Sequence, residues 1–419
     1  MNTHLVHTIR MALPAGDYGA AISHQAAARH WIAHALQPML ASQLDSLHVG
    51  DEIVFIEKIE LELTDYPWSL SEAAWRQKLA SAIQVRHAVA DSFSYLLKQW
   101  FFYLHHGCFE TGAFVKSVTA LEDYLVRKEH LWPAAPVQQY SVVVSPSFLQ
   151  RLFFRHKSKT VMSFLEKWLQ LPAEQVQPVY GALYKLSAIE PANAVAWLAA
   201  MAQAVKEKNK AAENVLLRQL AQDNLATPDR KADKRIFSRY TKTGEDPEES
   251  DPAIALHCPC AGLVLLFPYI RQFFQNCGLV KDAAFVSDHA QQLAVQALYF
   301  LASGMPSAPD EELLLPKLLC GLEPGIYLAP EHELPPFIQK EGRELLQEVI
   351  AHWKTLKSTS IESFQETFLQ REGRLLRSHN VYTLQVAESG VDVLLNSIPW
   401  GFRNYKLPWM PVALQTEWY

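Results

Sequence analysis

The feature that most constrains the fold is a long helical stretch, residues 145–225, that prolines divide into short pieces. Its runs "VMSFLEKWLQL" and "AVAWLAAMAQAVKEKNKAAENVLLRQLAQ" are rich in Ala and Leu and contain no proline. The prolines in "QLPAEQVQP" and "IEPAN" are expected to end helices, because proline lacks the N–H that a helix needs. The pattern predicts short antiparallel helices rather than one continuous rod.

Composition favours a helix-rich globular protein. Of the 419 residues, 49% are hydrophobic and 20% are charged, as in ordinary soluble proteins. Only 16 residues are glycine, about half the average usage, which disfavours glycine-rich phosphate loops and turn-dense all-β folds. The net charge of -6 argues against a general nucleic-acid binder, which usually carries a basic surface.

The cysteines and the hydropathy pattern indicate in which compartment the protein is made and whether it enters a membrane. Five scattered cysteines do not form a disulfide framework, so we expect synthesis in a reducing compartment. The opening "MNTHLVHTIRMALPAGDYGA" lacks the features of a cleaved signal peptide. The longest apolar run, "AGLVLLFPYI", is broken by Pro268 and is about half as long as a membrane-spanning helix. We therefore expect no stable membrane insertion.

The N-terminal part reads as β-α-β-α. Alternating apolar residues predict strands over residues 5–13 and 53–63, which we expect to pair in a small sheet. A helical stretch over residues 69–97 follows the second strand and begins with Ser69 and Glu72 at capping-box spacing. Residues 98–135 are expected to form aromatic-rich helical packing.

Residues 227–252 interrupt this pattern. Basic residues from Arg230 to Lys242 are followed by acidic ones from Glu245 to Asp251, with few apolar groups between them. Such a segment cannot bury enough apolar surface to offset its ordering entropy and is predicted to be a flexible linker. Its "KRIFSRY" also resembles a nucleic-acid-binding arm, but the acidic half balances the basic half, so we favour the linker.

The C-terminal part becomes compact again. Helices are expected over "SDHAQQLAVQALYFLASG", with Gly304 as C-cap, over "EGRELLQEVIAHWKTL", and over "TSIESFQETFLQREG", with Ser360 as N-cap and Gly373 as the stop. The stretch "RLLRSHNVYTLQVA" predicts a β-hairpin, and "GVDVLLNSI" a last short helix. We therefore predict a mainly α protein with a small α+β domain (1–135), a helical region (136–226), a flexible linker (227–252) and a helical C-terminal domain carrying one β-hairpin (253–419).

Candidate chemistry is sparse. The chain lacks the phosphate-loop, dinucleotide-binding, zinc-protease and nucleophile-elbow motifs. "HCPC" offers His257, Cys258 and Cys260 as zinc ligands, but no further ligand pair follows at zinc-finger spacing. We interpret these thiols, like Cys277 and Cys320, as buried small hydrophobes, and we predict no metal or cofactor.

The candidate acid–base residues also lack a carboxylate or a nucleophile at a sequence spacing typical of catalytic sites. The histidines considered are His105, His106, His130 and His352. The paired carboxylates Glu311 and Glu312 lie in a segment that looks solvated. We assign no catalytic residue and expect no enzyme; a metal-dependent enzyme through "HCPC" remains the alternative.

The chain ends in "SIPWGFRNYKLPWMPVALQTEWY", which is unusually aromatic. Proline fixes φ, so two Pro-Trp steps make a stiff, non-helical path. Large rings with few rotors suit either a core or a binding hot spot. We expect Trp400 and Trp409 to be mainly core anchors, each costing about 3–5 kcal/mol on replacement by Ala if buried.

Four blocks together resemble the tape measure protein family of contractile injection systems, the phage-tail-like particles of bacteria. They are "AGLVLLFPYIRQFFQNCGL", "LLLPKLLCGL", "ETFLQREGRL" and "IPWGFRNYKLPWM" with the final "EWY". Cys260 stands where the family pattern leads us to expect Asn. "IEKIELEL" near the N-terminus is similar to the family's opening. The residues that carry the resemblance are Gly262, Pro268, Pro316, Lys317, Arg371, Gly373, Trp400, Lys406, Pro408, Trp409 and Trp418.

The resemblance implies a non-enzymatic structural protein that sets the length of the inner tube and sheath. It implies tube and baseplate subunits as partners, self-association as a further one, and neither nucleic acid nor cofactor. It also implies a bacterial cytoplasmic location during assembly, followed by association with the particle. The alternative is a baseplate or tube assembly chaperone without ruler action.

Overall fold

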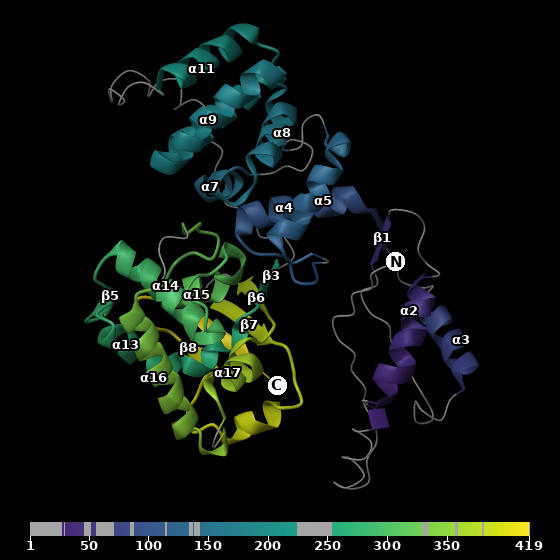
Figure 1. Cartoon of the computed structure of the whole chain (residues 1–419), viewed down its shortest axis with the longest axis vertical. Helices are drawn as coiled ribbons and strands as arrows, with labels where there is room; N and C mark the ends of the chain where they lie inside the picture. The colour runs from purple at the N-terminus through teal and green to yellow at the C-terminus, as the bar shows by residue number, and fades with distance from the viewer. Residues whose placement is uncertain are drawn as a thin grey trace. The chain divides into compact units, whose positions relative to one another are not determined.

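The computed structural model describes residues 27–28, 30–45, 52–55, 71–83, 88–113, 115–133, 137, 143–223, 254–329, 334–356, 359–378 and 381–418. The chain forms two compact units, Met1–Lys98 and Gln99–Tyr419 (Figure 1). The described part is mainly helical, as expected, and it contains a small mixed sheet near the C-terminus. The expected strand over residues 5–13 and the expected linker over 227–252 lie outside the described residues.

The first unit combines helices with a two-stranded sheet. Its elements are η1 (Ile32–Leu36), α2 (Gln37–Asp45), β1 (Glu52–Phe55), α3 (Glu72–Ile83), β2 (Ala88–Asp91) and the start of α4 (Ser92–His106). The strands are antiparallel, with Val54 opposite Val89. Trp75 of α3 is buried, and its ring centroid lies 4.8 Å from that of Trp31.

The helix expected over residues 69–97 is wrong in its middle, because β2 interrupts it at Ala88–Asp91. Pairing with β1 satisfies the backbone groups of β2 and overrides the helical propensity of the sequence. The start of α3 is also corrected: Ser71 accepts a hydrogen bond from the Ala74 N–H (3.3 Å), so Ser71 is its N-cap. Ser69 lies outside the described residues.

The first part of the second unit is a bundle of short helices. After α4 come α5 (Val118–Arg127), η3 (Glu129–Leu131), α7 (Pro146–Arg155), α8 (Ser158–Leu169), α9 (Ala173–Ile189), α10 (Pro191–Lys206) and α11 (Lys210–Asp223). Helix α10 packs against α7, α9 and α11. The expected short packed helices are confirmed.

Prolines lie at the starts of α7, α9 and α10. Pro172 is the N-cap of α9, and Pro191 is the first residue of α10, where a missing N–H costs nothing. Pro178 does not end a helix but lies inside α9. It falls in the second turn on an exposed face, where water can solvate the carbonyl that loses its partner.

An aromatic core fills the bundle where residues 98–135 meet α8. Trp100 is fully buried, and its ring centroid lies 5.3 Å from that of Trp132 and 5.2 Å from that of Phe164. The Trp100 indole N–H donates a hydrogen bond to His156 Nε2 (3.1 Å). The expected aromatic-rich helical packing is confirmed.

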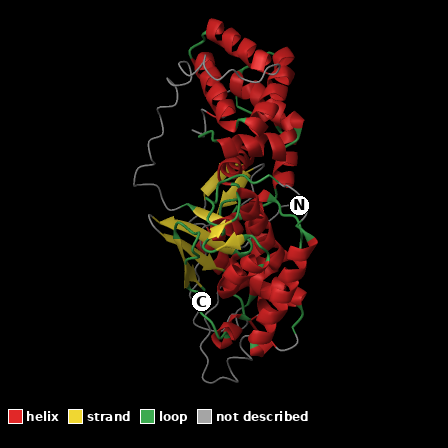
Figure 2. Ribbon diagram, turned by 90° about the vertical axis from the view of Figure 1, so that its left-hand side faces the viewer, coloured by secondary structure: helices red, strands yellow, loops and turns green. Residues whose placement is uncertain are grey.

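The second part of this unit contains a five-stranded sheet, with helices to one side of it in Figure 2. Its elements are β3 (Ala255–Cys258), η4 (Ala261–Leu266), α13 (Phe267–Asn276), β4 (Val280–Lys281), β5 (Ala284–Phe285), α14 (Asp288–Ser303), η5 (Asp310–Glu312), α15 (Leu314–Leu319), α16 (Pro336–His352), η6 (Lys354–Leu356), α17 (Ile361–Phe364), η7 (Gln365–Leu369), β6 (Gly373–Ser378), β7 (Val381–Val386), η8 (Asp392–Ser397), β8 (Asn404–Tyr405) and β9 (Ala413–Glu417).

The predicted hairpin exists as β6 and β7, but it is only the middle of the sheet, whose order is β3-β6-β7-β9-β8. The β7–β9 pair is parallel and the other pairs are antiparallel. The predicted hairpin is therefore correct, but the prediction missed the other three strands of the sheet. The aromatic tail supplies β8 and β9, and the "HCPC" segment supplies the end of β3.

Helix η4 lies at the centre of the core of this part. All of its residues, Ala261–Leu266, are buried, and it contacts β7, α14 and η7. The expected caps are confirmed: Gly304 ends α14 with φ 74°, and Ser360 Oγ accepts from the Ser363 N–H. Gly373 is not a helix stop, because η7 already ends at Leu369 and Gly373 begins β6. No helix in the described part of the chain is long and apolar enough to cross a bilayer.

Candidate functional site

The first and third sequence blocks meet backbone to backbone. A Cβ on Gly262 would lie 1.7 Å from the Phe368 carbonyl oxygen, so only glycine fits. The Ala261 N–H donates to the Arg371 carbonyl (2.9 Å). A Cβ on Gly373 would lie 2.6 Å from Ala261 Cβ. The two glycines thus allow η4 to lie directly against the chain that leads from η7 into β6.

The two Pro-Trp steps place both indoles at the margin of this core. Trp400 is half-buried, and its indole N–H donates to the Leu265 carbonyl (2.9 Å). Trp409 is also half-buried, and its indole N–H donates to the Leu319 carbonyl (2.8 Å). Each ring therefore ties the tail to a different block. Because each keeps an exposed edge, truncation to Ala should cost less than for a fully buried ring.

Arg371 holds the last tryptophan. Its guanidinium donates to both carboxylate oxygens of Asp392, at 2.8 and 3.2 Å, and also to the Ala387 carbonyl. The same guanidinium lies 5.4 Å from the centroid of the Trp418 ring. Trp418 is itself only 4% exposed. The Gln-Arg-Glu-Gly step and the chain end, far apart in sequence, are thus parts of one cluster.

The second block contributes a buried ion network. The Lys317 side chain is fully buried, and its Nζ lies 2.6 Å from Asp310 Oδ1. The other oxygen of Asp310 accepts from Arg151 Nε at 2.6 Å. Burial alone would raise the pKa of Asp310, but Lys317 and Arg151 outweigh burial and lower it. Burial lowers the pKa of Lys317, and the Asp310 carboxylate opposes that effect.

Arg151 connects the helical bundle to the sheet-containing part. It comes from α7, and its remaining N–H groups donate to the carbonyls of Leu104 (3.1 Å), His105 (3.2 Å) and Gly325 (2.8 Å). Gly107 makes room for it, since a Cβ there would lie 2.2 Å from the guanidinium. The guanidinium therefore fixes α4, α7 and the segment after α15 at one point.

Sequence reasoning missed this network and misjudged its surroundings. The interpretation of Glu311 and Glu312 as solvated is wrong: Glu311 pairs with Arg155 (3.1 Å), and Glu312 accepts from the Tyr299 hydroxyl (2.6 Å). Burial raises the pKa of Glu311. The run "PDEELLLP" shows its charges but not their burial, which depends on helices far away in the sequence.

The remaining residues that carry the resemblance are peripheral or packed. Lys406 is exposed, and its Nζ donates to the Pro411 carbonyl (3.0 Å). Pro268 and Pro408 are exposed, whereas Pro316 is buried in α15. The structure brings Gly262, Arg371, Gly373 and Trp418 together and leaves Lys406 and Pro408 outside that cluster.

The "HCPC" segment is packed into the sheet. His257 Nδ1 lies 3.3 Å from Glu372 Oε2, while Cys258 and Cys260 are buried free thiols. Burial raises the pKa of Cys260 to about 12, so the thiolate that a metal requires is disfavoured. Within the described ranges, no group of three or more His, Cys, Asp or Glu side chains is arranged to hold a metal ion.

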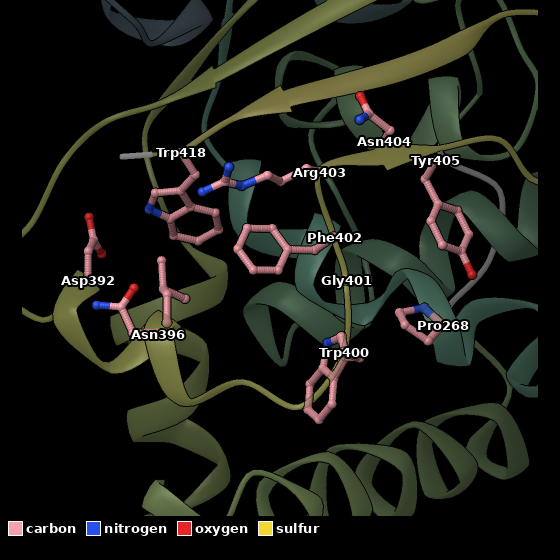
Figure 3. A pocket seen from close by; sticks show the side chains of 11 residues that line it. Pro268, Asp392, Asn396, Trp400, Gly401, Phe402, Arg403, Asn404, Tyr405 and Trp418 are labelled. Atoms are coloured by element: carbon pink, nitrogen blue, oxygen red, sulfur yellow. The ribbon is translucent and has the colours of Figure 1, made fainter.

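The tail also shapes a pocket of about 750 Å³ (Figure 3). It is lined by Pro268, Asp392, Leu395, Asn396, Trp400, Gly401, Phe402, Arg403, Asn404, Tyr405 and Trp418. The lining therefore comes from the first block through Pro268, from η8 through Asp392 and Leu395, and from the aromatic tail.

Gly262, Lys317 and Arg371, three of the residues that carry the resemblance, pack into the core of the described chain and join its parts. The sequence pattern of the contractile injection system tape measure proteins matches residues 3–418. The chain therefore belongs to this family. No curated protein and no solved structure matches it.

Proposed function

We propose that the chain is a non-enzymatic assembly protein that sets the length of the inner tube, and hence of the sheath, of a contractile injection particle. The observation that carries this proposal is the family match over residues 3–418, which spans both compact units. The packing of Arg371, Gly262 and Lys317 supports a structural use for the residues that define the family pattern.

The partners that follow from this role are inner-tube and baseplate subunits, with self-association as a further contact. The chain would act in the bacterial cytoplasm during assembly and then stay with the particle. A baseplate or tube assembly chaperone is the alternative, and it needs the same partners without a dependence of tube length on chain length.

The folded helices are short for a ruler. The longest in the bundle, α9, has 17 residues and spans about 25 Å, whereas the whole chain as one helix would reach on the order of 600 Å. A ruler would therefore use its chain in a more extended form. Residues 145–225 and 227–252 are the segments proposed to extend, with the parts on either side acting as anchors.

A series of insertions and deletions in residues 145–225 and 227–252 tests the proposal. Particle length, measured by electron microscopy, should change in proportion to the number of residues added or removed. A slope of about 1.5 Å per residue indicates helix, and about 3.3 Å per residue indicates extended chain. Scrambling residues 227–252 at constant length is the control and should leave particle length unchanged.

The alternative gives a different result in the same series. An assembly chaperone would yield particles of normal length in lower number when these segments are altered. Particle length that does not respond to either segment would contradict the ruler and favour the chaperone.

A further inference from the structure

The pocket built by the tail presents polar groups that do not take part in the packing of the core: a guanidinium, a sheet edge and an indole N–H. We infer that it binds an extended peptide segment bearing a carboxylate side chain, supplied by another protein subunit of the particle. This inference rests on the proposed function only for the origin of the peptide. The nature of the ligand follows from the charge, the sheet edge and the rings at the pocket.

The uncompensated charge at the pocket is positive. Arg403 is exposed and points along the pocket toward Trp418 (Figure 3), and its guanidinium makes no hydrogen bond or ion pair with any other described residue. Asp392 is the one carboxylate among the lining residues, and Arg371 neutralises it. The Ser389 N–H also donates to Asp392 (2.7 Å). A ligand carboxylate would therefore meet a free guanidinium, which forms strong, bidentate hydrogen bonds with such groups.

The wall of the pocket includes the end of the sheet. Strand β8 is the last in the order β3-β6-β7-β9-β8, and it pairs on one side with β9. The Thr416 N–H donates to the Arg403 carbonyl (2.6 Å). Since successive residues of a strand direct their backbone groups to opposite sides, those of Asn404 face the free edge. An extended peptide can pair with such an edge, which gives main-chain affinity.

Aromatic rings supply the apolar surface. Phe402 and Trp418 pack edge to face with ring centroids 5.9 Å apart, and Trp400 lies lower in the pocket (Figure 3). The indole N–H of Trp418 is buried and has no acceptor in the described chain. Buried donors normally have a partner, and Figure 3 shows this nitrogen on the Asp392 side of the pocket. A peptide carbonyl bound there would satisfy it.

The test uses the full-length protein and overlapping synthetic peptides that cover the tube and baseplate subunits of the particle. Fluorescence anisotropy would measure binding of each labelled peptide. Peptides that bind should contain Asp or Glu, and replacing that residue by Asn or Gln should weaken binding about tenfold. Arg403→Gln should weaken binding to a similar degree. Because Arg403 is exposed, the variant should keep the melting temperature of the wild-type protein.

Matched variants separate a specific site from general charge attraction. Arg218→Gln removes an exposed cation on α11 outside the pocket and should leave peptide affinity unchanged. Trp418→Phe keeps an aromatic ring but removes the idle N–H, so it should weaken binding while the protein stays folded. Equal peptide affinity in Arg403→Gln and wild type would overturn the inference, as would the absence of any binding peptide.

Two further results would also overturn it. Concentration-dependent dimerisation that Arg403→Gln abolishes would assign the pocket to a second copy of the chain. Equal binding of the Glu and Gln forms of a peptide would remove the need for a carboxylate. These outcomes are distinct from failure of the ruler, because every chain in the insertion series keeps Arg403 and the readout there is particle length.

Discussion

At the scale of single residues, the absence of one carbon decides how closely η4 can approach the end of η7. Gly262→Ala would place a Cβ 1.7 Å from a carbonyl oxygen, so the two segments must separate. We expect the free energy of unfolding to fall by more than about 3 kcal/mol, as measured by urea denaturation.

The matched control is Gly181→Ala on α9. A Cβ at this position meets no atom within 4 Å, and alanine is the better helix former, so the free energy of unfolding should rise by about 0.5–1 kcal/mol. If Gly262→Ala unfolds at the same urea concentration as the wild type, the close contact between η4 and η7 is not essential to the fold.

Some residues could be found from sequence and others could not. Lys317 stands out because it interrupts an apolar block, and Arg371 because it belongs to the Gln-Arg-Glu-Gly step. Asp310 does not, because its partner Arg151 is 159 residues away and nothing in "PDEELLLP" distinguishes a buried carboxylate from two half-buried ones. A charge whose burial depends on a distant partner leaves no local pattern.

At the scale of helices, the N-terminus of α8 is stabilised by a side chain from α5. Helix α8 begins after Lys157, which offers no side-chain cap. Instead, Glu122 Oε1 accepts from the Lys157 N–H (2.7 Å) and from the Thr160 hydroxyl (2.6 Å). A carboxylate at this position also interacts favourably with the helix dipole. The ionised form of Glu122 thus joins two helices of the bundle.

This contact predicts a dependence of stability on pH. Burial would raise the pKa of Glu122, but the hydrogen bonds and the adjacent His156 outweigh burial and lower it from 4.5 to about 2. Since the folded pKa lies below the unfolded one, the contribution of about 3 kcal/mol is present above pH 4.5 and is lost as the pH falls toward 2. Urea denaturation as a function of pH measures it.

The comparison with Glu122→Gln isolates this contribution from the other carboxylates. The variant should be less stable than the wild type at pH 7, and the difference should shrink as the pH falls from 4.5 toward 2. A difference that stays constant over this range would mean that the charge of Glu122 does not stabilise the junction between α5 and α8.

Element prediction succeeded where the signal was local. Ser360 and Gly304 lie next to the helices that they cap. Strand β9 was missed although the buried Leu414 and Thr416 flank the exposed Gln415. The reason is that the prediction for the tail rested on its aromatic residues. Strand β2 was missed because α3 separates it in sequence from its partner β1. The helical patterns of α3 and α4 on either side of β2 therefore led to the prediction of one continuous helix.

At the scale of the whole molecule, several contacts join the bundle to the sheet-containing part and bypass the covalent path through residues 224–253, and two of them lie at the buried ion network and at β3. One is the buried network in which Arg151 of α7 meets Asp310 and Lys317. The other is backbone pairing between residues 109–111 and β3, where the His257 N–H donates to the Phe109 carbonyl (2.9 Å). Extension of residues 145–225 as a ruler would have to break the first contact.

These contacts predict that the covalent link is not needed for association. A protease site placed within residues 227–252 would cut the chain, and the two fragments should remain together in size-exclusion chromatography under native conditions. Arg151→Met removes the charged link and its hydrogen bonds but leaves Asp310 paired with Lys317, so each fragment should still fold. We expect the two fragments of this variant to separate or to associate at least about tenfold more weakly, because the buried hydrogen bonds from the Arg151 guanidinium to Asp310 and to the Gly325 carbonyl are lost.

Lys340→Met is the control, because Lys340 belongs to an exposed i,i+4 pair on α16 with Glu344 (3.6 Å). Such a pair contributes little, and the cut chain should stay associated as in the wild type. Separation of the wild-type fragments at micromolar concentration would show that the buried network does not join the two parts. The helical middle could then extend without a barrier at Arg151, and the insertion series alone would decide how the chain sets length.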